Sequence, residues 1–279
     1  MGTSKLGDRC ARPRITMACV TFALLSLGFA QPQLPQHWFQ ERGPASDRDA
    51  ISFCIDPRDP GHIVDAAIAE SIAASLLVNV RLHVVKSAFF QDDFDDLYFE
   101  LMEHCTAYVG FRLYSDTYPE WLTVTRSFYE ARFVLVTTEP DWHELSDIPV
   151  EVPIGVVQGT MGDVRFLMAN NALPANQRRP RQPLGRPPLA FDALMAGRVS
   201  VLLVWEPWWW WLAQERPELG DLRVVTAPHV SDPAIGVGAV LVAGRTFARA
   251  SIDEAVAAMI ADGTIERIIE EFAYPAAVP

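Results

Sequence analysis

The chain has 279 residues, half of them hydrophobic, and a formal net charge of −12. That length and composition support one large domain or two smaller ones with real cores. The acidic balance argues against nucleic acid as a partner, because phosphate binding needs a basic surface.

The first thirty residues have the pattern of a secretory signal peptide. Basic residues open the segment, an apolar stretch follows at 15–29, and small residues at 28 and 30 fit cleavage after Ala30. An uncut N-terminal anchor is the alternative. We expect a periplasmic protein with no membrane insertion once the signal is removed. Residues 31–50 are rich in Pro and Gln and predict a flexible leader.

Two cysteines follow the predicted signal, Cys54 and Cys105. In an oxidising compartment a pair of cysteines predicts one disulfide, and two buried thiols are the alternative. The pair would lie on the first strand and just before the third, which are neighbours in a sheet of order 2-1-3.

Hydrophobic periodicity predicts alternating strands and helices. Apolar runs predict strands at 51–55, 81–85, 107–111, 131–137, 153–157, 200–205 and 236–243. Helical spacing predicts helices at 63–77, 92–104, 189–197 and 251–272, and one that begins near 163. This order predicts parallel sheets with helices on both faces.

The elements divide into two α/β lobes. We expect lobe 1 to contain residues 51–135 and 236–279, and lobe 2 to contain residues 136–235. The chain would cross between them near 134–138 and near 234–238.

The layout resembles the type II periplasmic binding proteins, in particular family 3 of the extracellular solute-binding proteins. The resemblance covers about residues 50–276. Its motifs are CIDPRDP (54–60), DTYPEWLTVTRSFYEARFVLVT (116–137), IGVVQGTMGD (154–163), AFDALMAGRVSVLLVWEP (190–207) and ADGTIERIIEEFAYP (261–275). It implies a two-lobed α/β fold with two hinge crossings.

A narrower resemblance is to the family members associated with quinoprotein (methanol) dehydrogenases. It rests on CIDP at 54–57, Cys105, TRSFY at 125–129, VWEP at 204–207 and IIEEFAYP at 268–275. The chain departs from that pattern at two positions. Glu206 stands where the pattern has glycine, and Phe128 stands where it has tyrosine. This resemblance implies an accessory factor that contacts a periplasmic PQQ-dependent dehydrogenase in assembly or activation. The alternative is a receptor of an ABC importer for a small polar or amino-acid-like ligand.

Amino-acid-binding members of the family carry a Thr-Pro-Glu-Arg-like element whose arginine holds the ligand carboxylate. Trp121 stands at that position here, and an indole cannot replace a bidentate arginine. The resemblance therefore puts binding of zwitterionic amino acids in doubt. Arg112 and Arg126 are the candidate substitutes, although the spacing requires neither.

Other positions complete the predicted ligand site. Gly159 and Thr160 form a turn before a helix, which either exposes backbone N–H groups to an anion or is a simple capped turn. Glu206 ends a buried strand, where it either faces the ligand or forms a rim ion pair. The predicted ligand-cleft residues are Asp56, Arg112, Trp121, Gly159, Thr160, Met161 and Glu206.

Four consecutive tryptophans follow Pro207. Proline fits the first turn of a helix, in which successive residues step by about 100° around the axis. One packed face cannot bury all four, so we expect some to pack on the sheet and the rest to contact a partner. The predicted partner-contact residues are Trp208, Trp209, Trp210 and Trp211.

No motif for catalysis, metal or cofactor binding stands out. The histidines show no metal-ligand spacing, and the acidic run at 92–96 lacks the spaced glycine loop of a calcium site. Nucleophile-elbow, P-loop and dinucleotide patterns are missing from the sequence. We therefore expect a protein that is not an enzyme and has no catalytic residue, metal or cofactor.

Overall fold

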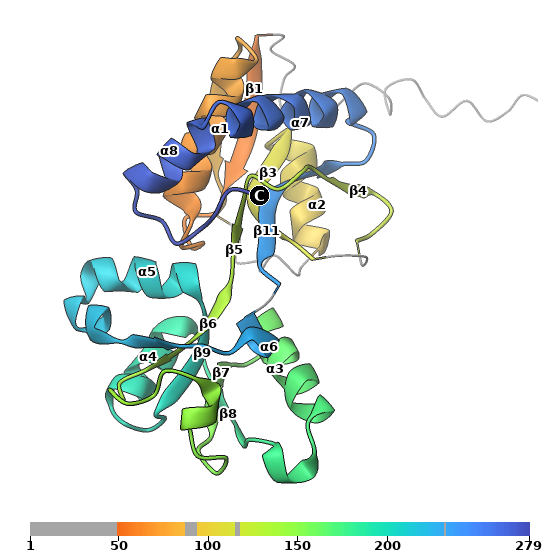
Figure 1. The fold of residues 1–279 in the computed structure, drawn as a ribbon. Helices are drawn as coiled ribbons and strands as arrows, with labels where there is room; N and C mark the ends of the chain where they lie inside the picture. The colour runs from red at the N-terminus through yellow and green to blue at the C-terminus, as the bar shows by residue number, and fades with distance from the viewer. Residues whose placement is uncertain (1–48, 87–93, 115–117, 232) are drawn as a thin grey trace, which may run out of the picture. The chain divides into compact units, whose positions relative to one another are not determined.

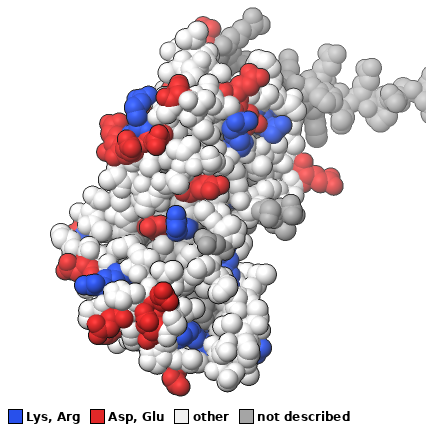
Figure 2. Space-filling view, in the orientation of Figure 1, with Lys and Arg blue, Asp and Glu red and all other residues white. Residues whose placement is uncertain are grey.

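The computed structural model describes residues 49–86, 94–114, 118–231 and 233–279. The predicted signal peptide and all but the last two residues of the predicted leader lie outside this range. The described chain forms two β-sheets with helices packed on them (Figure 1). Within these residues no helix has the length and apolar character needed to span a membrane. Acidic and basic side chains are interspersed over the face drawn in Figure 2.

The first sheet has six strands. Its order is β2-β1-β3-β11-β4, and β5 also pairs with β11. Strands β1 to β3 are parallel, whereas β11 runs antiparallel to β3, β4 and β5. The strands are β1 (Ala50–Ile55), β2 (Asn79–Val84), β3 (Ala107–Leu113), β4 (Leu122–Val124), β5 (Tyr129–Ala131) and β11 (Ile235–Val242).

Helices cover both faces of this sheet. On one face α1 (His62–Ser75) packs with α7 (Thr246–Ala261) and α8 (Thr264–Glu271), around a core that includes Phe53 and Ile68. On the other face α2 (Phe94–Glu103) buries Leu97 and Leu101 against Cys54 and Tyr108. Residues 53 and 54 face opposite helices because side chains alternate along a strand.

The second sheet has five strands in the order β10-β6-β9-β7-β8. Its strands are β6 (Phe133–Thr137), β7 (Ile154–Val157), β8 (Arg181–Leu184), β9 (Val201–Trp205) and β10 (Arg223–Val225). Its helices are α3 (Met161–Ala172), α4 (Pro187–Met195), α5 (Glu206–Glu215) and α6 (Pro228–Ser231). Strands β7 to β9 are parallel, whereas β6 is antiparallel to its neighbours β9 and β10.

The chain passes between the two sheets twice, as predicted. The first passage is at Arg132, because Tyr129–Ala131 pairs with β11 and Phe133 already pairs with β9. The second lies between α6 and β11. The predicted first crossing, near 134–138, falls inside β6. Residues 131–137 (ARFVLVT) predict one strand, because a single arginine near the start of an otherwise apolar segment does not by itself indicate a change of sheet.

The predicted disulfide is confirmed. Cys54 on β1 and Cys105 in the turn before β3 are bonded, with 5.5 Å between their Cα atoms. Both side chains are fully buried. Closing a loop with a sequence separation of 51 residues contributes about 4 kcal/mol in the chain-entropy account.

Strand β3 contains a bulge at Gly110. Val109 pairs with Ala239 and Phe111 pairs with Gly238, so Gly110 is an extra residue in the ladder. Its φ is +76°, and a Cβ there would collide with the carboxylate of Asp65. An extra residue reverses the alternation of side chains. Residues 109 and 112 therefore face the same side of the sheet.

We expect Gly110→Ala to lower the free energy of unfolding by about 3 kcal/mol, because the variant combines left-handed backbone strain with a steric clash. Gly263→Ala is the matched control, since Gly263 has the same φ of +76° but a Cβ added there would have its nearest neighbour 3.9 Å away. The control should lose about 1 kcal/mol. Denaturant unfolding measures both, and equal losses would contradict a steric role for Gly110.

Candidate functional site

Several predicted ligand-cleft residues lie at the carboxyl ends of strands. Asp56 follows β1, Arg112 is near the end of β3, Gly159 and Thr160 follow β7, and Glu206 follows β9. Parallel α/β sheets place ligands at these ends. The structure, however, does not bring all of these residues into one site.

A contact between the two sheets forms at these strand ends. The guanidinium carbon of Arg112 lies 5.5 Å from the ring centroid of Trp205, the last residue of β9. Nη2 of Arg112 also lies 2.7 Å from Oδ2 of Asp59, in the turn after β1. We call Asp59, Arg112 and Trp205 the strand-end site. Its carboxylate, guanidinium and indole come from separate parts of the chain.

Asp59 is held in place by its own turn. Its Oδ1 accepts a hydrogen bond of 2.9 Å from the backbone N–H of Gly61. Burial raises the pKa of Asp59, and the positive charge of Arg112 opposes that rise. The guanidinium therefore stabilises a carboxylate that the surrounding protein would otherwise disfavour.

A buried polar cluster lies beside the strand-end site. The Tyr129 hydroxyl donates to Oδ1 of Asp65 at 2.9 Å, and the hydroxyls of Tyr129 and Tyr274 are 3.4 Å apart. A Cβ on Gly61 would lie 2.5 Å from the Tyr274 hydroxyl and 3.0 Å from that of Tyr129. Helix α1, strand β5 and the C-terminal segment therefore meet at this cluster.

Burial raises the pKa of Asp65 well above its ordinary value. The nearby charge of Asp59 adds to this effect, whereas the hydrogen bond from Tyr129 opposes it. Burial thus makes the Asp65 carboxyl harder to ionise in the folded protein than in the unfolded chain.

The turn at Gly159 is largely satisfied within the chain. Its N–H donates to Oδ2 of Asp163 at 3.1 Å, and Nε of Arg181 donates to Oδ1 of Asp163 at 2.6 Å. Thr160 caps α3, its Oγ1 accepting from the N–H of Asp163 at 3.4 Å. Met161, the first residue of α3, is partly buried against the main core. The carboxylate of Asp163 thus already accepts a hydrogen bond from the Gly159 amide, one of the amides predicted to bind an anion.

Trp121 does not lie with the strand-end site. Its ring contacts Tyr98 and Phe94 of α2, with centroids 4.9 Å and 6.4 Å apart, on the face of the first sheet that carries Cys54. Arg126 is exposed, and its backbone N–H donates to Asp253. Of the two candidate substitutes for the missing arginine, Arg112 is the one beside Trp205. Asp56 accepts hydrogen bonds from Arg58 in its own turn.

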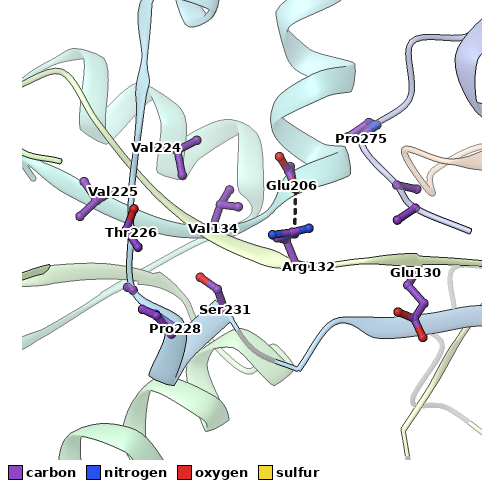
Figure 3. Close-up of a pocket in the computed structure, with 13 residues that line it drawn as sticks. Glu130, Arg132, Val134, Glu206, Val224, Val225, Thr226, Pro228, Ser231 and Pro275 are labelled. Carbon is purple, nitrogen blue, oxygen red and sulfur yellow. Dashed lines mark ion pairs between the residues drawn. The ribbon is translucent and has the colours of Figure 1, made fainter. Parts of the chain in front are cut away.

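A separate cavity of about 400 Å³ lies beside the first passage between the sheets (Figure 3). We call it the hinge pocket. Glu206 and Arg132 line it, with their charged atoms 3.9 Å apart. Burial raises the pKa of Glu206, and Arg132 opposes the rise. The other polar side chains that line the pocket are Glu130, Thr226 and Ser231.

The hinge pocket changes the predicted position of Glu206. Trp205 packs with Phe133 in the main core, whereas Glu206 lines the hinge pocket with Arg132 and Val134. Trp205 is the last residue of β9 and Glu206 the first residue of α5, so the two side chains leave the chain in different directions. The sequence leaves Glu206 either facing a ligand or in a rim ion pair, and in the structure its carboxylate pairs with Arg132. The pocket itself has no signal in the sequence, because its lining comes from segments far apart in the chain.

The four tryptophans of α5 are all partly buried, and each has a neighbour within the chain. Trp209 donates through Nε1 to the carbonyl of Leu219 at 2.7 Å, and Trp208 packs on Trp211 with centroids 5.3 Å apart. Trp211 meets His62 of α1 edge-on at 5.9 Å, and Trp210 meets Tyr274 at 5.0 Å. The helix predicted to contact a partner thus contacts elements of the first sheet.

No family model and no curated protein matches this sequence. Solved structures do match. The substrate-binding protein of an amino acid ABC transporter aligns with 80% of this chain and 98% of its own, at 17% identity and a TM-score of 0.54. An ancestral arginine-binding protein bound to arginine aligns with 81% and 98%, at 18% identity and 0.55. The GluR0 ligand-binding core in complex with L-glutamate aligns with 80% and 97%, at 11% identity and 0.59.

These similarities confirm the predicted fold, a two-lobed α/β fold of the type II periplasmic binding proteins. They also show that the expected role beside a PQQ-dependent dehydrogenase is wrong, because the matching structures bind amino acids or belong to an amino acid transporter. The narrower resemblance rested on short motifs such as VWEP. In this structure VWEP spans the end of β9 and the start of α5, so it belongs to a strand–helix junction of the common fold.

We expect the pH dependence of stability to identify the buried carboxyl. Because the pKa of Asp65 is raised on folding, the stability that its neutral form contributes is fully present below about pH 4. It is lost as the pH rises through the folded pKa. Asp65→Asn keeps an acceptor for Tyr129 but cannot ionise. The free energy of unfolding of this variant, relative to the wild type, should therefore rise from pH 4 towards neutrality.

Asp163→Asn provides the opposite control. The hydrogen bond from Arg181 lowers the pKa of Asp163, so the stability that Asp163 contributes is present above about pH 4 and lost as the pH falls through the folded pKa. This variant should be less stable than the wild type at neutral pH and approach it in acid. Parallel pH profiles for the two variants would refute the assignment of Asp65.

Proposed function

We propose that the chain is an exported solute-binding receptor that delivers a small amino-acid-like ligand to an ABC importer. The observation that carries this proposal is the strand-end site, in which the Asp59–Arg112 pair of one sheet meets Trp205 of the other. The similar structures with amino acid ligands support the same class of function. The protein would bind its ligand without chemical conversion.

The charges of the strand-end site suit a zwitterion. A ligand carboxylate would bind the Arg112 guanidinium, and a ligand ammonium would bind the Asp59 carboxylate. The side chains of these two residues are only 22% and 13% exposed, so charge interactions there are weakly screened by water. Arg112 would thereby take the role left vacant by Trp121. The indole of Trp205 would pack against the apolar part of the ligand.

Two chain passages between the sheets suit a hinge. In this proposal the ligand stabilises the conformation in which residues from both sheets contact it, and the importer recognises that conformation. Residues 1–30 would direct export to the periplasm and the following residues would form the leader, which ends before β1 begins at Ala50. Lobe 1 would contain the first sheet and lobe 2 the second.

We expect one or more L-amino acids to raise the melting temperature of the purified protein. A ligand at one hundred times its Kd stabilises the folded state by about 2.7 kcal/mol, which a thermal shift detects readily. Arg112→Lys keeps the positive charge beside Asp59 but loses the planar fork, and should weaken binding at least about tenfold. Calorimetric titration of both proteins measures this change.

Arg132→Lys is the matched control, because Arg132 lines the hinge pocket instead of the strand-end site. This variant should bind the ligand as the wild type does. Weaker binding in Arg132→Lys with normal binding in Arg112→Lys would place the ligand in the hinge pocket. A panel of amino acids that produces no thermal shift at all would contradict the ligand class.

A further inference from the structure

A cluster of metal-ligating side chains surrounds the disulfide, on the face of the first sheet that α2 covers. Cys54 and His83 are direct partners in the register of the parallel strands β1 and β2, so their side chains share a face. Helix α2 lies on that face and carries Glu100, and Cys105 follows the helix. Three elements and one turn thus contribute one donor each.

The donors are close together. Sγ of Cys54, an imidazole nitrogen of His83 and a carboxylate oxygen of Glu100 all lie within 4.8 Å of one another. Nε2 of His83 is 3.3 Å from Oε2 of Glu100. Cys105 belongs to the same cluster, because its Sγ is bonded to that of Cys54. The Cys54, Cys105 and Glu100 side chains are buried, and His83 is partly buried.

Surrounding contacts hold this arrangement independently of the S–S bond. The ring of His104 stacks on His83, with centroids 4.4 Å apart and planes at 13°. The turn that carries Cys105 is fixed by Arg245, whose guanidinium donates to the carbonyls of Cys105 and Thr106 at 2.7 Å and 2.9 Å. We therefore expect the four donors to stay close after the sulfur atoms separate.

We propose that reduction of the Cys54–Cys105 disulfide creates a binding site for a thiophilic divalent cation of the zinc class. Two thiolates, one imidazole and one carboxylate form a tetrahedral donor set that suits Zn²⁺. The Cα separation of 5.5 Å lets the two sulfur atoms move apart by side-chain rotation. The disulfide form closes the site, because its sulfur atoms carry no thiolate charge.

The chemistry balances with a dithiol as the reductant. The dithiol gives two electrons and two protons, the S–S bond breaks, and the dithiol becomes a disulfide. The cation then displaces the two thiol protons and binds the thiolates. A small-molecule disulfide reverses both steps: the two thiolates form the S–S bond, the oxidant takes up two electrons and two protons to become a dithiol, and the cation is released. The same residues would thus alternate between a covalent and a metal-bound link from β1 to the α2–β3 turn.

Anaerobic titration with Co²⁺, a spectroscopic probe for zinc sites, tests the proposal. A phosphine reductant opens the disulfide without supplying competing thiols. The reduced protein should bind one equivalent and develop thiolate-to-cobalt charge-transfer absorption, whereas the oxidised protein should develop none. His83→Ala and Glu100→Gln should each weaken binding at least about tenfold. The control variants, His143→Ala and Glu103→Gln, alter exposed residues outside the cluster and should bind normally.

Circular dichroism of the reduced protein decides the remaining outcomes. A reduced protein that stays folded but binds no Co²⁺ would overturn the proposal. A reduced protein that unfolds and binds Co²⁺ equally well with and without His83 would also overturn it, because thiols in an unfolded chain would then be the only ligands. Equal binding by the folded His83→Ala variant would show that His83 and Glu100 form only an ion pair.

Discussion

The extra residue in β3 determines how the two sheets meet. Gly110 fits the bulge because its left-handed backbone and missing Cβ leave room for the carboxylate of Asp65. The bulge turns Arg112 to the face on which Asp59 lies. Without it, Arg112 would point towards the α2 side of the sheet, and the contact with Trp205 could not form. One backbone irregularity therefore sets the charge arrangement of the strand-end site.

The passage between the sheets is tied to that arrangement by the buried cluster. Tyr129 lies on β5, three residues before Arg132, and its hydroxyl binds Asp65. Tyr274 joins the cluster from the C-terminal segment and also contacts Trp210 of helix α5, which follows β9 of the second sheet. The segment that connects the sheets is thus anchored by buried polar contacts. Breaking one of them would leave a polar group buried without a hydrogen-bond partner, which lowers the stability of the fold.

Much of the fold was predictable because the strands of a buried sheet are apolar runs in the sequence, and because only two cysteines follow the predicted signal peptide. The predicted position of the first passage, near 134–138, was wrong. The passage lies at Arg132 because the strand pairing on either side of that residue, which composition does not reveal, decides where one sheet ends and the next begins. Trp121 was predicted in the ligand site from its alignment with an arginine, but packing with Phe94 and Tyr98 decides its position. Gly110, a glycine inside a strand pattern, was an available signal for the bulge. Arg112 was a candidate, but its side of the sheet depends on that bulge.

Helix α5 begins directly after β9, with no intervening loop, so its tryptophans must move as one body with the second sheet. The Trp209 indole donates a hydrogen bond to the carbonyl of Leu219, which follows α5 in the chain. Trp210 and Trp211 instead contact Tyr274 and His62, respectively. Any rotation about the passage at Arg132 would change the surroundings of Trp210 and Trp211, and of Trp205 beside Arg112, whereas Trp209 would keep its hydrogen bond to Leu219. The intrinsic tryptophan fluorescence of the protein would therefore report its conformation without an attached dye.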